Sequence, residues 1–111
     1  MKKIILETPL ISTNALYFTG GRRRLTPKAK YIKHSIGLEA RDQFHGEPLK
    51  GDLRIRVEMY FGDKRKRDID NIKALLDALS GIVWEDDSQI VELHLFKHVG
   101  AKKPRIEISL I

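Results

Sequence analysis

Three aspartates in two separate stretches have the residue type and spacing of a divalent-metal site. Asp68 and Asp70 follow a basic tetrad at 64–67, and Asp87 ends an acidic triplet at 85–87. Residues two apart in an extended segment face the same way, so Asp68 and Asp70 are expected to present their oxygens to one point. If the strand after Asp87 runs alongside the strand before Asp68, all three carboxylates meet. Converging carboxylates repel one another unless a cation lies among them, and Mg²⁺ or Mn²⁺ favours oxygen ligands.

The same acids have simpler roles to weigh. Asp68 or Asp70 could be the N-cap of the next helix, and the acids at 85–87 could form a solvated loop. A calcium loop is excluded, because Ile72 occupies the third ligand position. His94 and His98 lie four apart on one strand face, but two histidines without Cys or a nearby acid are weak zinc ligands.

The overall charge points to a polyanionic partner. The chain has 21 Lys and Arg against 15 Asp and Glu, a net charge of +6, which favours nucleic acid over an anionic membrane. We expect two basic stretches to bind the phosphate backbone. They contain Arg22, Arg23, Arg24, Lys28, Lys30, Lys64, Arg65, Lys66 and Arg67.

The absence of Cys excludes disulfides, thiolate zinc sites and a cysteine nucleophile, and it fits a reducing compartment. No apolar stretch approaches the roughly 20 residues that span a bilayer. We therefore expect no membrane partner and a cytoplasmic, nucleoid-associated protein.

The hydrophobic pattern predicts a single domain, residues 1–111, which is long enough for one core and too short for two. The expected elements are a strand, a helix, a strand, a helix and two strands. They cover 2–7, a helix that opens at 26–27, 51–61, 72–79, 89–98 and 104–111. This order indicates an α+β domain in which two main helices cover one face of a small mixed or antiparallel sheet.

Periodicity carries these assignments. Strict alternation of apolar and polar residues from 51 to 61 predicts a half-buried strand. Apolar residues recur every fourth position from Ile32 to Phe44, after a Thr-Pro pair that suits a helix start, while Gly37 weakens this helix. A short turn containing Gly and Lys separates the last two strands, so we expect them to pair as a hairpin.

Several motifs together resemble those of the RusA-type Holliday junction resolvases. They are Asp68-Ile69-Asp70-Asn71, then Lys73 with Leu76-Asp77-Ala78-Leu79, and the stretch from Trp84 to Val91. The loop from Ser12 to Tyr17 also looks like that family's first loop. The resemblance covers nearly the whole chain.

The resemblance implies a small homodimeric endonuclease, often encoded by prophages, that cuts four-way DNA junctions with Mg²⁺ or Mn²⁺ during recombination and repair. Asp68, Asp70 and Asp87 would be its metal-binding acids, and Asn14 would join the DNA-binding residues. Lys73 would match a lysine that the family needs for cleavage, but it stands two residues after Asn71, where the family pattern has three.

We therefore expect metal-assisted phosphodiester hydrolysis, in which the carboxylates hold the metal ion that assists cleavage and the basic residues bind the flanking DNA. Two symmetric nicks require two active sites and hence a two-fold dimer. Its interface would be the exposed side of the strand at 51–61 or apolar parts of the first helix. Two other functions stay open: a nuclease for flaps, forks or single strands, and a non-catalytic basic DNA-binding module.

Overall fold

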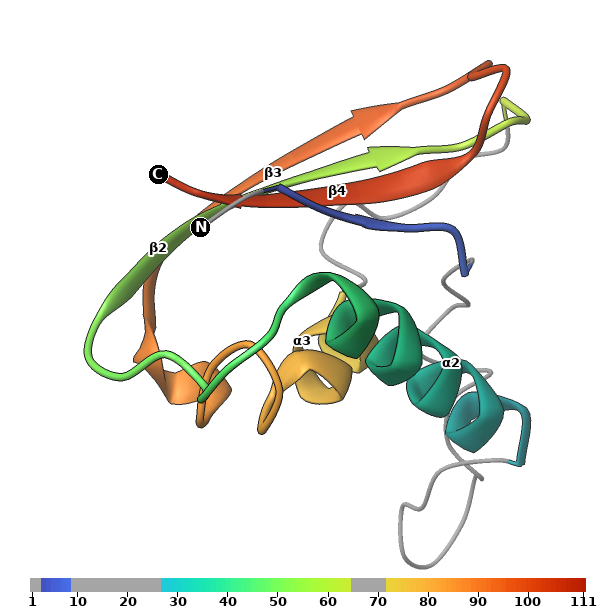
Figure 1. The fold of residues 1–111 in the computed structure, drawn as a ribbon. Helices are drawn as coiled ribbons and strands as arrows, with labels where there is room; N and C mark the ends of the chain where they lie inside the picture. Colours follow the sequence, from blue (N-terminus) through green and yellow to red (C-terminus); the bar gives the residue numbers. More distant parts are fainter. Residues whose placement is uncertain (1–2, 9–26, 65–71) are drawn as a thin grey trace, which may run out of the picture.

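A four-stranded sheet with two helices packed against one of its faces makes up the described part of the chain (Figure 1). The structure is a computed structural model that describes residues 3–8, 27–64 and 72–111. Its elements are β1 (Ile4–Leu6), α2 (Pro27–Gln43), β2 (Leu53–Tyr60), α3 (Lys73–Leu79), the 3₁₀ turn η1 (Asp87–Gln89), β3 (Ile90–His98) and β4 (Arg105–Leu110). This confirms the predicted α+β class and the predicted order of elements.

The strand order is β1-β4-β2-β3, with β2 paired on both sides. β2 runs parallel to β3 and antiparallel to β4, so the sheet is mixed. β2, α3 and β3 form a β-α-β unit, because the chain returns through α3 to start β3 beside the start of β2. The strand that follows Asp87 therefore does run alongside the strand that precedes Asp68, as the metal-site hypothesis requires.

The predicted hairpin between the last two strands is wrong. β2 lies between β3 and β4, and the turn that joins them passes over the end of β2, where the amide of Ala101 donates to the carbonyl of Phe61 at 2.9 Å. The physical reason is that β2 buries Leu53, Ile55 and Val57 in the core and so takes the central position. A short connector between two strands predicted pairing, but six residues are enough to span two strand spacings of about 4.8 Å each.

The core lies between the sheet and the helices. α2 contributes Ile32, Ile36 and Ala40 at the predicted spacing of four, and α3 contributes Leu75 and Leu79. All five are buried, whereas Phe44 at the end of the series is only partly buried. Within the described residues, neither helix has the length and apolar character that a membrane crossing needs.

Gly37 has a packing role that the sequence analysis did not assign. A Cβ placed on Gly37 would lie 3.3 Å from Cδ1 of Ile82, closer than most real contacts. The glycine therefore lets the segment after α3 approach α2 closely. The helix runs through Gly37 without interruption, so its lower helix propensity does not end α2.

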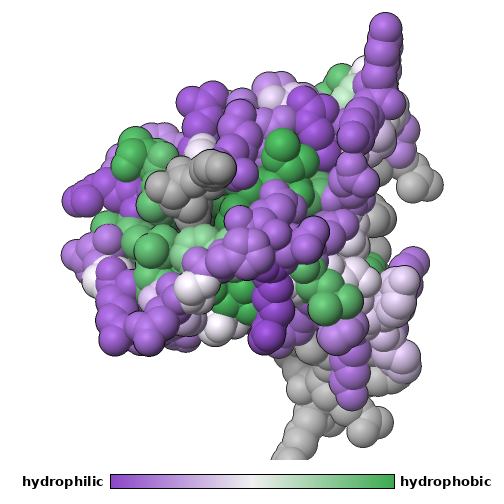
Figure 2. Space-filling model, viewed as in Figure 1, coloured by the Kyte–Doolittle hydropathy of each residue, from purple (hydrophilic) through white to green (hydrophobic). Residues whose placement is uncertain are grey.

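The sheet face opposite the helices is polar and carries ion pairs. Glu107 on β4 is only 9% exposed, and its carboxylate lies 2.8 Å from Nζ of Lys3 and 2.6 Å from Nε of Arg105. The hydrogen bond from Lys3, supported by Arg105, lowers the pKa of Glu107 below its usual value against the opposing effect of burial. Hydrophilic side chains likewise cover most of the molecular face in Figure 2, with hydrophobic ones in patches between them.

Candidate functional site

The structure describes one of the three predicted metal-binding acids. Asp87 is the first residue of η1, directly before β3, and its side chain is partly buried. Asp68 and Asp70 lie outside the described residues, so the meeting of the three carboxylates stays a prediction. Among the residues that the structure describes, no three His, Asp or Glu side chains come together in a way that would hold a metal ion. A carboxylate centre that includes Asp87 would thus need ligands from elsewhere in the chain.

The turn that carries Asp87 is fixed by its neighbours. The Asp86 carboxylate accepts from the amide of Ser88 at 3.1 Å, and the Gln89 side chain accepts from the amide of Asp86 at 2.8 Å. These reciprocal bonds form a capping box around η1. The hydrogen bond from Ser88 lowers the pKa of Asp86. Asp86 is therefore the structural acid of the triplet, and the carboxylate of Asp87 takes part in none of these bonds.

Gln89 also ties the turn to the loop that leads into β2. Its Nε2 donates to the carbonyl of Leu49 at 3.0 Å and to that of Gly51 at 2.9 Å. Because β2 starts two residues after Gly51, these bonds fix the acidic turn against the beginning of the central strand. The turn that carries Asp87 is thus held by hydrogen bonds within the turn and by hydrogen bonds to the loop before β2.

Trp84 anchors the chain just before this turn. Its side chain is fully buried, and its Nε1 donates to the hydroxyl of Ser80 at 3.2 Å. That hydroxyl donates in turn to the carbonyl of Leu76 in α3 at 3.1 Å. The acidic triplet therefore follows directly from a tryptophan that is bonded to the end of α3, and it forms an ordered turn in which Glu85 and Asp86 are exposed to solvent.

Lys73, the lysine implied by the resemblance, is the first residue of α3. Its Nζ lies 3.6 Å from the Asp77 carboxylate one turn later, and its side chain is 60% exposed. A cation in the first turn opposes the helix dipole, so the ion pair with Asp77 offsets an unfavourable position. Lys73 is separated from the undescribed segment 65–71 by Ile72, which is buried.

The N-cap position of α3 belongs to Ile72, which makes no side-chain capping hydrogen bond. The alternative in which the Asp68 or Asp70 carboxylate caps this helix concerns residues outside the described part of the chain.

The histidines of β3 pair with glutamates on the polar face of the sheet. Nε2 of His94 lies 3.0 Å from the Glu92 carboxylate, and Nε2 of His98 lies 3.4 Å from that of Glu58. Neither belongs to a metal-binding group in the described part of the chain.

Three of the predicted DNA-binding residues are described, and all three are exposed. Lys28 and Lys30 lie in the first turn of α2, which carries no acidic residue, and Lys64 follows β2. The others lie outside the described residues: Asn14, Arg22, Arg23, Arg24, Arg65, Lys66 and Arg67.

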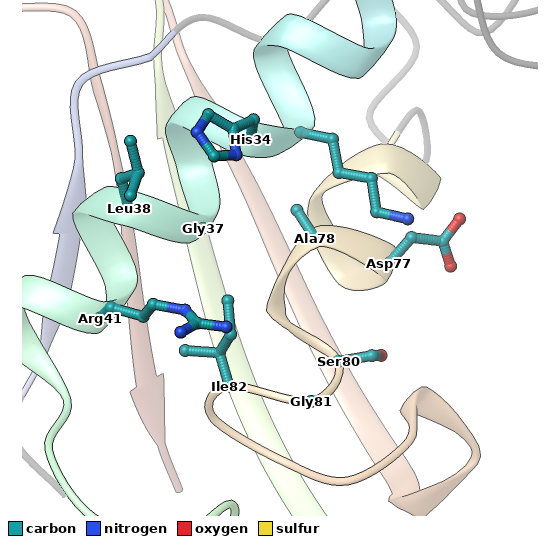
Figure 3. A pocket seen from close by; sticks show the side chains of 10 residues that line it. His34, Gly37, Leu38, Arg41, Asp77, Ala78, Ser80, Gly81 and Ile82 are labelled. Carbon is teal, nitrogen blue, oxygen red and sulfur yellow. The ribbon is translucent and has the colours of Figure 1, made fainter.

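Further along α2, the structure adds basic residues that the sequence analysis did not assign to DNA binding. Lys33, His34 and Arg41 line an open hollow of about 510 Å³ between α2 and the segment after α3. In Figure 3 the side chain of Arg41 extends from α2 toward Ile82 on the opposite wall. The spacing of eight between Lys33 and Arg41 places both on one helix face, and this signal could have been read from the sequence.

Comparison with known proteins places these features in a family context. A family model described as Endodeoxyribonuclease RusA matches residues 8–111. The chain is 38% identical to the crossover junction endodeoxyribonuclease RusA of Shigella sonnei (strain Ss046), and 28% identical to that of Escherichia coli (strain K12). Both matches cover 99% of this chain and 95% of the relative. The relative from Enterobacteria phage 82, which has the same name, is 28% identical over 81% of this chain and 77% of its own length.

Proposed function

Because this chain belongs to the RusA family of endodeoxyribonucleases, we propose that it is a Mg²⁺- or Mn²⁺-dependent endodeoxyribonuclease that resolves four-way DNA junctions by paired nicks. The observation that carries this proposal is the family match, which spans both acidic motifs in one chain. The relatives above are named as crossover junction enzymes, and the proposal extends that substrate to this chain.

The position of Asp87 supports a metal-binding role. Asp86 and Gln89 hold the turn, while the Asp87 carboxylate stays outside their hydrogen bonds. A carboxylate presented in this way fits Mg²⁺ or Mn²⁺, which both prefer oxygen ligands. We propose that Asp68 and Asp70 complete the ligand set.

When bound, the metal ion would lower the pKa of a water molecule and stabilise negative charge on the scissile phosphate. The chain's own contribution is positioning: the bonds from Gln89 to the loop before β2 fix where the Asp87 carboxylate lies. Lys73 would lie near the phosphate, where its ammonium group stabilises the developing charge. The ion pair with Asp77 keeps this ammonium group close to the surface of α3.

The basic residues would supply affinity. Lys28 and Lys30 lie at the start of α2, and the hollow beside Lys33 and Arg41 continues the positive charge along the same helix. Such residues contact phosphates, so they position the duplex arms and report little about base sequence. We propose a two-fold homodimer, because two symmetric nicks need two active sites.

The test is cleavage of a labelled synthetic four-way junction by the purified chain, with Mg²⁺ or Mn²⁺ titrated against an EDTA control. We expect paired nicks that require the metal, together with much slower cutting of flaps, forks and single strands. Asp70→Asn should abolish nicking and leave junction binding intact.

Each other result rejects a defined part of the proposal. Binding without nicking at any Mg²⁺ or Mn²⁺ concentration would identify a non-catalytic DNA-binding module. Faster cutting of flaps or forks would assign a different branched substrate. Metal-dependent cleavage that survives Asp70→Asn would reject the assigned ligand set.

A further inference from the structure

β3 is a long strand at the edge of the sheet. It has nine residues and pairs with β2 on one side, and no other strand in the described part of the chain pairs with its outer side. The free N–H and C=O groups of such an edge are a template for pairing with another chain. Shortening or a proline would block this pairing, and β3 has neither.

Apolar side chains accompany this edge. Val91 is 52% exposed and Leu93 is 38% exposed. Leu93 lies opposite Ile55 of β2 and so shares the helix side of the sheet with Leu95, which packs against the core. Val91 is the extra residue of a β-bulge, because Leu53 pairs with Ile90 and Arg54 with Glu92. The edge therefore continues the hydrophobic core outward to solvent.

We propose that β3 pairs edge to edge with β3 of a second copy of this chain, antiparallel and with Leu93 opposite the partner's Leu93. In this register the two Leu93 side chains meet on the helix side, and the bulge at Val91 of each copy lies beside the partner's Leu95. On the polar side, Glu92 lies opposite the partner's His94. The sequence of β3 is thus complementary to itself in apolar side chains and in the hydrogen-bonding partners Glu92 and His94.

Neighbouring registers also bring apolar residues of the two copies opposite each other, but they lose the pairing of Glu92 with the partner's His94. A two-fold axis at Glu92 would place two glutamates opposite each other. An axis at His94 would place Val91 opposite the partner's Lys97 and two histidines opposite each other. Registers shifted by a single residue would put apolar side chains opposite charged ones, because every side chain changes face.

The proposed pairing joins two four-stranded sheets into one of eight strands, with the helices of both copies on the same side. It differs from both interfaces that the sequence suggested. The inference rests on the proposed function only for the expectation of a two-fold dimer, and its test does not depend on DNA cleavage.

The register can be tested with single cysteines, because the chain has none of its own. Cysteines at opposite positions of an antiparallel pair have Cβ atoms about 4.5–5.5 Å apart, near the range of a disulfide. Leu93→Cys should therefore form a disulfide-linked dimer under mild oxidation. Val91→Cys, the matched control, should not, because two copies of residue 91 lie about four residues apart along the strands. Linkage of Val91→Cys but not of Leu93→Cys would overturn the register.

The interface itself is tested by sedimentation of the full chain. We expect a dimer whose dissociation constant rises at least ~100-fold in Leu93→Lys, since each dimer loses two apolar contacts. Leu38→Lys changes an exposed leucine of α2 in the same way and should leave the dimer intact. A monomeric wild type, or a Leu93→Lys variant that dimerises normally while folded by circular dichroism, would overturn the proposal. A dimer that forms as described but cuts no DNA would instead reject the proposed function.

Discussion

Asp86 and Asp87 are adjacent carboxylates with different roles. The Asp86 carboxylate accepts a hydrogen bond in the capping box, and this hydrogen bond from Ser88 lowers the pKa of Asp86. Asp87 is left available to a ligand. The sequence predicted an acidic cluster, and the resemblance selected Asp87 within it. What holds the turn is the hydrogen bond from Gln89 to the carbonyl of Leu49, which lies 40 residues earlier in the chain. Such long-range hydrogen bonds leave no periodic trace in a sequence.

Asp87→Asn should abolish cleavage while binding to a four-way junction persists. The amide keeps the size of the side chain but is a far weaker ligand for Mg²⁺. We expect the single-turnover rate to fall at least ~100-fold, in line with losses of one catalytic electrostatic group. Rates at saturating protein, with binding followed separately by fluorescence anisotropy, measure both quantities.

Glu85→Gln is the matched control for this variant. Glu85 is exposed, and its contact is a loose ion pair with Lys50 at 3.9 Å. The Glu85→Gln variant should cleave the junction at the wild-type rate. Equal losses in Glu85→Gln and Asp87→Asn would mean that the charge of the triplet matters and that Asp87 has no special role.

Glu107 makes a pH-dependent contribution to stability. Its pKa is lowered in the folded state, so its carboxylate stabilises the fold above the unfolded pKa and loses this effect as pH falls through the folded pKa. Glu107→Gln should therefore lower the free energy of unfolding by about 1–2 kcal/mol at pH 7, allowing for the half-exposed Lys3.

The check is urea unfolding of the wild type and Glu107→Gln at several pH values. The difference in the free energy of unfolding should be constant from pH 7 to about 5 and shrink as pH falls below about 4. A difference that stays constant down to pH 3 would show that the carboxylate charge is not what stabilises this site.

At the scale of elements, α2 and the segment after α3 pack closely because Gly37 has no Cβ. Gly37→Ala gains helix propensity of about 1 kcal/mol, but its Cβ would lie 3.3 Å from Cδ1 of Ile82. Ile82→Val removes that Cδ1. We expect Gly37→Ala to be nearly neutral in the wild type and to stabilise the Ile82→Val background by ~0.5–1 kcal/mol.

A double-mutant cycle of thermal or urea unfolding measures this coupling. Ala40, which is buried on the same helix and does not line the hollow beside Ile82, offers a comparison: Ala40→Gly should cost about 1 kcal/mol or more in both backgrounds. If Gly37→Ala has the same effect with and without Ile82→Val, the close approach does not constrain residue 37.

Much of the fold was predictable because its elements carry local periodicity. The alternation in β2 and the four-residue spacing in α2 correspond to buried faces in the structure. The pairing of β3 and β4 was not predictable in this way, because strand order depends on which strand buries the most apolar surface. The short connector between β3 and β4 favoured a hairpin. Instead β2, which buries Leu53, Ile55 and Val57, lies between these two strands.

At the scale of the whole molecule, the net charge of +6 predicts salt-dependent binding to DNA. The logarithm of the association constant should fall linearly with the logarithm of salt concentration, with a slope of about −0.9 per phosphate contact. Lys30→Gln should reduce the magnitude of this slope by about one, because it removes one proposed contact in α2.

Lys103→Gln makes the same change of charge at the β3–β4 turn, where Lys103 pairs with Glu7 at 3.0 Å. It should leave the slope unchanged. Salt titrations of junction binding for the two variants separate a localised contact surface from a general effect of net charge, which would alter both slopes equally.

The place of β4 in the sheet also governs when this molecule can fold. β4 comes after the other strands in the chain, yet it lies between β1 and β2 and is the neighbour through which β1 joins the sheet. Until residues 105–110 leave the ribosome, β1 has no strand to pair with and one edge of β2 stays open. During synthesis, β1 and this edge of β2 therefore stay unpaired in the nascent chain. We expect native structure to form only after translation has passed β4.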